Sequence, residues 1–356
     1  MWSPIKLTRP GDRAIVALPA PAPIKVNIHR VISLFRELNN SSTKLKLCQQ
    51  GVSGENGAMS KASFTSTDNR QIELEYDYFG DPSHPALLLI MGFTAQMVAW
   101  EEKFCLLLAS RGHFVIRFDN RDCGLSTKLH GVPSNSDAVI MAAMMETEMP
   151  QVAYTLVDMA GDAAKLLDHL NIERAHIMGA SMGGMIAQTF AINYPHRTKT
   201  LISIMSQPGE MTVGQATPEA MALIITPAPS TRDEYIAFAP NWQLWQSKKY
   251  RSDEISRRNA IRDFDRSNYP EGGPRQMAAI YASGSRAEGL QQLSMPALVI
   301  HGTDDQLITP SGGERTAELM SNSTLLMVDD MGHDMPEPLW PLYVDAITKH
   351  TSLVTA

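Results

Sequence analysis

Cysteine is scarce in this chain. Only three are present among 356 residues, at positions 48, 105 and 123. They are too few and too widely spaced to form a disulfide framework or a cysteine-based zinc cluster. A reducing compartment is the simplest interpretation, and we expect a cytoplasmic location.

Long apolar runs are also missing. No stretch approaches the roughly 20 apolar residues that a membrane-spanning helix needs, so no integral membrane span is expected. The N-terminus lacks the charged and then apolar pattern of a secretory signal. Hydrophobic residues at 44% and charged residues at 19% nevertheless predict a folded globular protein.

The chain has no excess of positive charge. Its formal net charge is −7, and this disfavours nucleic acid as a partner, because such proteins normally present a basic face. The charge is unevenly distributed. Residues 1–62 contain nine Lys and Arg against three Asp and Glu, whereas the remainder contains 22 against 35.

Residues 1–62 differ from the rest of the chain in pattern as well. Apolar residues at helical spacing predict one amphipathic helix over residues 26–39, and the polar residues 39–60 then indicate a linker. A loosely docked extension is the preferred interpretation. A membrane-surface helix, an organelle address or an oligomerisation arm remain open, so a homo-oligomer is possible.

From residue 64 onward, apolar runs alternate with amphipathic segments. An early antiparallel strand is expected at residues 71–78. Further strands are expected at residues 86–91, 113–118, 175–178, 201–205, 297–300 and 323–328, and helices at residues 100–110 and from Leu156 to Leu170. This rhythm predicts an α/β fold with a mostly parallel sheet covered by helices on both faces.

About ninety residues interrupt that rhythm before the last two strands. Residues 207–294 contain helical patterns at 218–225, 232–247, 253–266 and 274–282, and no convincing strand. We expect them to form a helical cap over the strand ends, where ligands bind in open α/β sheets. The core would then comprise residues 63–206 and 295–356.

One stretch of the sequence contains the candidate nucleophile. In RAHIMGASMGGMIAQ (174–188), a buried strand runs into Gly179-Ala180-Ser181-Met182-Gly183 and then into a helix. This matches the nucleophile elbow, a strained turn that exposes a serine hydroxyl and needs small neighbours two residues either side. A glycine-rich turn that merely ends a strand is the alternative.

A serine nucleophile needs a base that is oriented by a third group. The strand at 297–300 is followed by Asp304 and Asp305, and the strand at 323–328 is followed by His333. The order serine, acid, histidine is typical of this elbow. We expect Ser181 as nucleophile, His333 as base and Asp305 as the orienting acid, with Asp304 as the alternative acid. His350 is disfavoured as the base because it lies near a disordered-looking tail.

The reaction would also need donors for an oxyanion. The Met182 N–H opens the helix after Ser181, where backbone donors are unpaired. A second donor is expected from the loop after the strand at 86–91, and the Phe93 N–H, next to Gly92, is our choice.

Several motifs together resemble a known family. The segments are ALLLIMGF, VIRFDNRDCGLS, AHIMGASMGGMIAQ, PALVIHGTDD and MGHDMP. From residue 64 onward the chain resembles an α/β-hydrolase with a helical cap, and within that superfamily the aclacinomycin methylesterase-like carboxylesterases. The resemblance implies hydrolysis of a small-molecule ester by the triad, without metal or cofactor. More widespread relatives have His-Gly where this chain has Met91-Gly92, and residues 1–62 have no counterpart in the family core.

Other residues near these motifs have less specific roles. Asp119, Arg121 and Gly124 are interpreted as an ion pair and turn beside the pocket, and Cys123 has no partner that would activate it. Met144 and Met145 belong to a methionine-rich segment that either fills the core or forms a pliable pocket wall. For the aromatic residues expected in the cap, packing within the cap is preferred over lining the pocket: Tyr235, Phe238, Trp242 and Trp245.

The leading hypothesis is therefore a serine carboxylesterase that acts on small to medium esters through an acyl-enzyme. A lactonase, a carbon–carbon bond hydrolase or a cofactor-free perhydrolase would use the same residues. A non-catalytic binding protein on this scaffold is the alternative from another class, because a fold does not by itself establish function.

Overall fold

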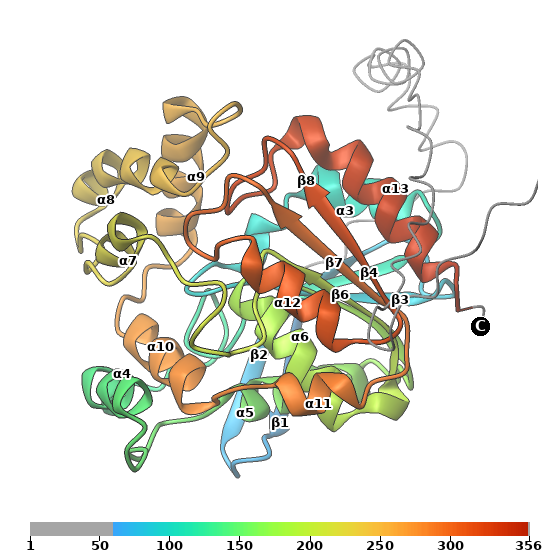
Figure 1. The fold of residues 1–356 in the computed structure, drawn as a ribbon, viewed down its shortest axis with the longest axis horizontal. Helices are drawn as coiled ribbons and strands as arrows, with labels where there is room; N and C mark the ends of the chain where they lie inside the picture. The colour runs from blue at the N-terminus through green and yellow to red at the C-terminus, as the bar shows by residue number, and fades with distance from the viewer. Residues whose placement is uncertain (1–59, 355–356) are drawn as a thin grey trace, which may run out of the picture. The chain divides into compact units, whose positions relative to one another are not determined.

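The computed structural model describes residues 60–354, and an eight-stranded sheet lies at their centre (Figure 1). The strands are β1 (Ser60–Thr65), β2 (Gln71–Phe79), β3 (Ala86–Ile90), β4 (Phe114–Phe118), β5 (Ala175–Ala180), β6 (Thr198–Ile204), β7 (Ala297–Gly302) and β8 (Ser323–Val328). Their order in the sheet is β1-β2-β4-β3-β5-β6-β7-β8. The expected helix at residues 26–39, the linker to residue 60 and Cys48 lie outside the described residues.

The sheet is mostly parallel, as the sequence predicts. β2 pairs antiparallel with both β1 and β4, and every other neighbouring pair is parallel. β1 is a correction to the sequence analysis, because it begins at Ser60 inside the segment assigned to the extension and linker. Its sequence SKASFT is largely polar, since this strand pairs only with β2 at the edge of the sheet.

The central strands are apolar because both faces of the sheet are buried there. All five residues of β3 are buried, and they alternate between two separate cores. Leu88 and Ile90 belong to one core, and Leu87 and Leu89 to the other. This alternation follows from the two-residue period of a β-strand and explains why β3 reads as one continuous apolar run.

Helices cover both faces (Figure 1). The first core includes side chains of α5 (Leu156–His169), α6 (Met182–Asn193), α11 (Ala287–Gln291) and α12 (Ser311–Leu319). The second includes side chains of α3 (Glu102–Ala109) and α13 (Trp340–Thr351). The start of α5 is set by a capping box, in which the Thr155 and Asp158 side chains each pair with the other residue's backbone N–H.

The C-terminal helix α13 corrects a second expectation. His350 lies within it and is 5% exposed, so the end of this segment is an ordered helix packed on the sheet. Leu342 in α13 is exposed, so the apolar residues of this helix do not all lie on its buried face. For this reason the sequence analysis did not predict a helix in this segment.

Between β6 and β7 the described chain contains helices and loops only. The elements are α7 (Pro218–Ile224), α8 (Arg232–Phe238), the 3-10 helix η3 (Ala239–Leu244), α9 (Asp253–Arg266), α10 (Gly272–Ala282) and α11. One continuous helix over 232–247 was expected and is wrong. The α-helix ends at Phe238 and Pro240, which lacks a backbone N–H, follows at the start of η3.

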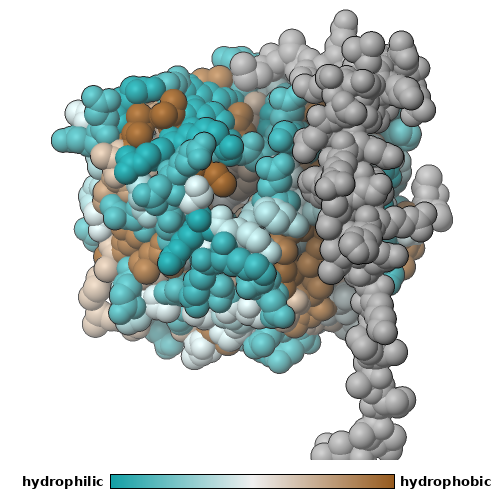
Figure 2. All heavy atoms as spheres, turned by 90° about the horizontal axis from the view of Figure 1, so that it is seen from above, coloured by the Kyte–Doolittle hydropathy of each residue, from teal (hydrophilic) through white to brown (hydrophobic). Residues whose placement is uncertain are grey.

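The visible surface is largely polar with separate apolar patches (Figure 2). Within residues 60–354, no helix combines the length and the apolar character that a membrane span requires. Several methionines contribute to the exposed apolar surface, three of them on α4 (Ser136–Met145): Met141, Met144, Met145, Met149 and Met211.

Candidate active site

Ser181 occupies a strained turn between β5 and α6. Its backbone has φ 58° and ψ −124°, a combination that only glycine adopts readily. A Cβ at Gly179 would overlap the carbonyl oxygen of Gly183, and a Cβ at Gly183 would overlap that of Ile90. The two glycines of the motif are therefore required sterically, and the turn has the geometry expected of a nucleophile elbow.

The structure brings the three expected side chains together. His333 Nε2 lies 2.9 Å from Ser181 Oγ, and His333 Nδ1 lies 2.8 Å from Asp305 Oδ2. With its proton on Nδ1, the imidazole donates to the carboxylate and accepts from the serine hydroxyl. All three residues follow parallel strands (β5, β7 and β8), so they converge at the carboxyl edge of the sheet.

The structure distinguishes the two candidate acids. Asp305 is 3% exposed, and its second oxygen, Oδ1, accepts hydrogen bonds of 2.9 Å from the N–H groups of Leu307 and Ile308. Asp304 is only partly buried and instead pairs with Lys248 at 3.3 Å. Asp305 is thus the carboxylate that faces His333, and its own loop holds it in place.

A buried carboxylate follows His333 and connects its loop to the cap. Asp334 Oδ1 accepts hydrogen bonds from the N–H groups of Ser247 and Gly332, and burial raises the pKa of Asp334 to about 6. The His333 N–H donates to the carbonyl oxygen of Trp245 at 2.6 Å. The segment after η3 is therefore hydrogen-bonded directly to the loop that carries the histidine.

The loop after β3 lies against the serine. A Cβ at Gly92 would lie 3.0 Å from Ser181 Cβ and 3.5 Å from Ser181 Oγ, so glycine permits this close approach. Phe93 follows directly. Met182 is the first residue of α6, so its N–H is one of the donors that a helix leaves unpaired at its start. Met182 thus adjoins the serine in the chain, and Phe93 follows the glycine that packs against it.

Asp119 and Arg121 form ion pairs, but with other residues and not with each other. Asp119 pairs with Arg266 at 2.8 Å, and it accepts hydrogen bonds from the N–H groups of Met97 and Leu125. Gly124 has φ +55°, and a Cβ there would overlap the Asp119 carboxylate. The expected turn at Gly124 is confirmed, whereas the expected ion pair between Asp119 and Arg121 is wrong. The residues fix the loop after β4 through other partners.

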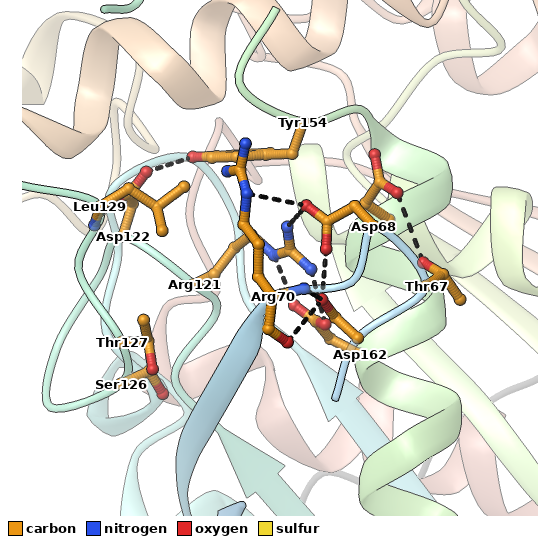
Figure 3. Close-up of polar contacts among 12 residues, drawn as sticks. Thr67, Asp68, Arg70, Arg121, Asp122, Ser126, Thr127, Leu129, Tyr154 and Asp162 are labelled. Atoms are coloured by element: carbon orange, nitrogen blue, oxygen red, sulfur yellow. Dashed lines mark hydrogen bonds and ion pairs between the residues drawn. The ribbon is translucent and has the colours of Figure 1, made fainter. Parts of the chain in front are cut away.

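Arg121 lies at the centre of a buried polar network (Figure 3). Its guanidinium donates to both oxygens of Asp162 in α5 and to Asp68 in the turn between β1 and β2. It also lies 5.1 Å from the ring centre of Tyr154, whose hydroxyl donates to Asp122. The network joins α5, the β1–β2 turn and the loop after β4.

The remaining predictions have mixed outcomes. Cys123 is buried, and burial raises its pKa well above the usual value, which disfavours the reactive thiolate. Met144 and Met145 are 64% and 65% exposed, which excludes the core-filling interpretation and leaves the pocket-wall role as a prediction.

The packing interpretation of the cap aromatics is confirmed for three of the four residues. Ring centres of Tyr235 and Trp242 lie 5.2 Å apart, and those of Phe238 and Trp242 lie 5.8 Å apart. Trp245 contacts the histidine loop through its backbone carbonyl oxygen.

Sequence reasoning missed two residues of this region. Asp334 adjoins His333 in the motif MGHDMP, so its position was a usable signal. Gln276 in α10 donates to the Arg121 carbonyl oxygen and accepts from the Thr94 N–H, and it is 0% exposed. No local pattern identifies such a residue, because its partners lie 155 and 182 positions away.

Within residues 60–354, no group of three or more His, Cys, Asp or Glu is arranged to hold a metal ion.

Comparison with known proteins gives matches over most of the chain. A family model described as the alpha/beta hydrolase fold matches residues 85–337. Rhodomycin D methylesterase from Streptomyces peucetius is 25% identical over 309 residues, which cover 81% of this chain and 97% of that protein. The 3-oxoadipate enol-lactonase 2 of Acinetobacter baylyi is 25% identical over 272 residues, covering 76% and 88%.

A solved structure matches as well. A thermophilic esterase from Thermogutta terrifontis superposes with a TM-score of 0.59 at 25% identity, covering 82% of this chain and 99% of that chain.

Proposed function

The chain belongs to the alpha/beta hydrolase fold family and is a carboxylic ester hydrolase, and from this premise we propose that it is a serine carboxylesterase that works through an acyl-enzyme. The proposal rests mainly on one observation: a continuous hydrogen-bonded chain runs from Ser181 Oγ through the His333 imidazole to Asp305. That chain occurs at a nucleophile elbow with strained backbone at the serine.

Each residue has a definite task in the proposed reaction. Ser181 Oγ attacks the ester carbonyl carbon while His333 Nε2 takes the hydroxyl proton. The negative oxygen of the tetrahedral intermediate accepts hydrogen bonds from the Phe93 and Met182 N–H groups. When the intermediate collapses, the ester bond to the alcohol breaks and His333 returns the proton to the departing oxygen. Water then repeats the sequence on the acyl-serine, and Asp305 holds the imidazole in the required tautomer throughout.

We propose that residues 207–294 act as the cap that shapes the substrate site. Support comes from the backbone contacts between this region and the loop of His333, through Trp245 and Ser247. Small to medium esters are the proposed substrates, with Met144 and Met145 as candidates for residues that contact the acyl or alcohol group.

A lactone is a second candidate substrate. It is a cyclic ester, so the same steps apply and the leaving alcohol simply stays attached to the acyl-enzyme. The similarity to an enol-lactonase supports this alternative. The carbon–carbon bond hydrolase and perhydrolase alternatives would use the same three side chains.

The test combines one variant with a substrate panel. Ser181→Ala should lower kcat by on the order of a million-fold if the triad acts as a unit. Near-normal ester turnover by this variant would contradict the proposal. A panel of p-nitrophenyl esters of increasing acyl length, lactones and vinylogous diketones separates the alternative reactions. Failure of the wild-type protein to react with a fluorophosphonate would favour the non-catalytic alternative.

A further inference from the structure

The loop after β3 has a strained backbone beside the proposed oxyanion donor. Thr94 has φ +56°, a conformation that β-branched residues rarely adopt and that persists only where surrounding groups hold it. Phe93, which carries the donor N–H, precedes it directly. The segment that presents this N–H is therefore adjacent to the strained residue.

Gln276 of α10 holds it through two hydrogen bonds. Its Oε1 accepts from the Thr94 N–H at 2.8 Å, and its Nε2 donates to the Arg121 carbonyl oxygen at 3.0 Å. The side chain is 0% exposed, so water cannot replace either partner. One turn earlier in α10, Gly273 lies against the same loop: a Cβ there would be 3.3 Å from Thr94 Cγ2 and 3.7 Å from Phe93 Cζ.

A second residue, Gln96, holds the other end of this loop by hydrogen bonds. Gln96 Nε2 donates to the carbonyl oxygens of Asp263 and Ser267, at the end of α9 and just beyond it, at 2.6 and 2.9 Å. Its Oε1 accepts from Arg266 Nη1 at 2.6 Å. The oxyanion loop is thus bound at Thr94 and at Gln96 by consecutive parts of the cap. This side of the cap is built into the site and is not a separate lid.

We infer that Gln276 is a positioning residue for the oxyanion hole. By satisfying the Thr94 N–H, it keeps Thr94 at positive φ and so keeps the Phe93 N–H directed, together with the Met182 N–H, at the substrate carbonyl oxygen. Without Gln276 the Thr94 backbone relaxes and the Phe93 donor turns away. The inference rests on the proposed serine esterase mechanism, since it assigns the cap a part in that mechanism's transition state.

Gln276→Met tests the inference against a matched control. Gln188 in α6 is also a fully buried glutamine with two hydrogen bonds, to Ser203 Oγ and from Arg286 Nε, but it does not contact the oxyanion loop. Both Gln276→Met and Gln188→Met should lower the melting temperature, because each leaves buried partners unsatisfied. Only the first should disturb catalysis.

The expected kinetic signature is a loss in kcat at nearly constant KM. Removing one oxyanion donor typically costs about a hundred- to a thousand-fold, so misplacing it should lower kcat for p-nitrophenyl acetate by roughly ten- to a hundred-fold. Gln188→Met should keep kcat within about two-fold. Unchanged kcat in Gln276→Met, or an equal loss in both variants, would overturn the inference.

Gln276→Glu supplies a second readout, and it applies even where Gln276→Met does not fold. The neutral carboxyl group can accept from the Thr94 N–H and donate its O–H to the Arg121 carbonyl oxygen, whereas the ionised form would repel that oxygen. The ratio of this variant's kcat to that of the wild type should therefore rise as the pH is lowered from about 8 to about 6. A ratio that stays constant with pH would refute the positioning role.

Ser181→Ala measured in parallel separates this inference from the proposed function. Turnover that survives in Ser181→Ala defeats the proposed function itself. If Ser181→Ala is inactive while Gln276→Met has normal kcat, only the role of Gln276 is wrong.

Discussion

The strained backbone at Ser181, the proposed nucleophile, predicts that a side chain at this position lowers the stability of the fold. Glycine adopts φ 58° and ψ −124° without steric cost, whereas a residue with a Cβ in this conformation destabilises the folded state by about 1–3 kcal/mol. Glycine also loses about 0.5–1 kcal/mol more than alanine through the entropy of its unfolded chain. The difference leaves Ser181→Gly more stable than Ser181→Ala by roughly 1 kcal/mol. Neither variant should hydrolyse esters.

Comparison of these two variants isolates the Cβ atom, because both lose the hydrogen bond between Ser181 Oγ and His333. Urea unfolding followed by tryptophan fluorescence measures the difference, and the melting temperatures should differ by about 1–2 °C for a folded unit of this size. Ala187→Gly is the control. Ala187 is buried in α6, where replacing alanine by glycine costs about 1 kcal/mol, so this change should have the opposite sign.

The reasoning fails if Ser181→Gly is as stable as Ser181→Ala or less stable. That result would mean that the Cβ atom does not strain the turn around Ser181.

Three further predictions concern the acid, the pH dependence and the pocket. Asp305→Asn should lower kcat for p-nitrophenyl acetate by about 10⁴-fold, because an amide favours the wrong imidazole tautomer, whereas Asp304→Asn should change it little; equal effects would contradict the assignment. Burial lowers the pKa of His350 to about 4, so its contribution to stability is present above pH 6.5 and is lost as the pH falls toward 4. When the pH is lowered from about 6.5 to about 4.5, the free energy of unfolding measured with urea should fall by roughly 2 kcal/mol less for His350→Gln than for the wild type. An equal fall in both proteins would refute this. Replacing Met144 and Met145 by Ala should shift the preferred acyl length across an ester series, and identical profiles would remove them from the pocket.

Local patterns predicted the parts of the molecule that depend on neighbouring residues. The Gly-x-Ser-x-Gly turn identified Ser181, because its glycines are needed by atoms only a few residues away. The apolar run of β3 revealed a strand buried on both faces. The strand and helix alternation placed Asp305 and His333 at the same edge of the sheet.

Features that depend on distant partners were left open or escaped prediction. The sequence analysis chose Asp305 but kept Asp304 as the alternative, since only the folded loop shows which carboxylate faces His333. β1 was missed because an edge strand needs little apolar patterning. Gln276 was missed because its partners are brought to it by the packing of α10 against two loops of the core.

The most direct test of the account is covalent labelling of the intact protein with a fluorophosphonate, followed by peptide mass spectrometry. We predict one phosphonyl group per chain, located on Ser181 and absent from the Ser181→Ala variant. Stoichiometric labelling of another residue, or labelling that persists in Ser181→Ala, would contradict the assignment of Ser181 as the nucleophile.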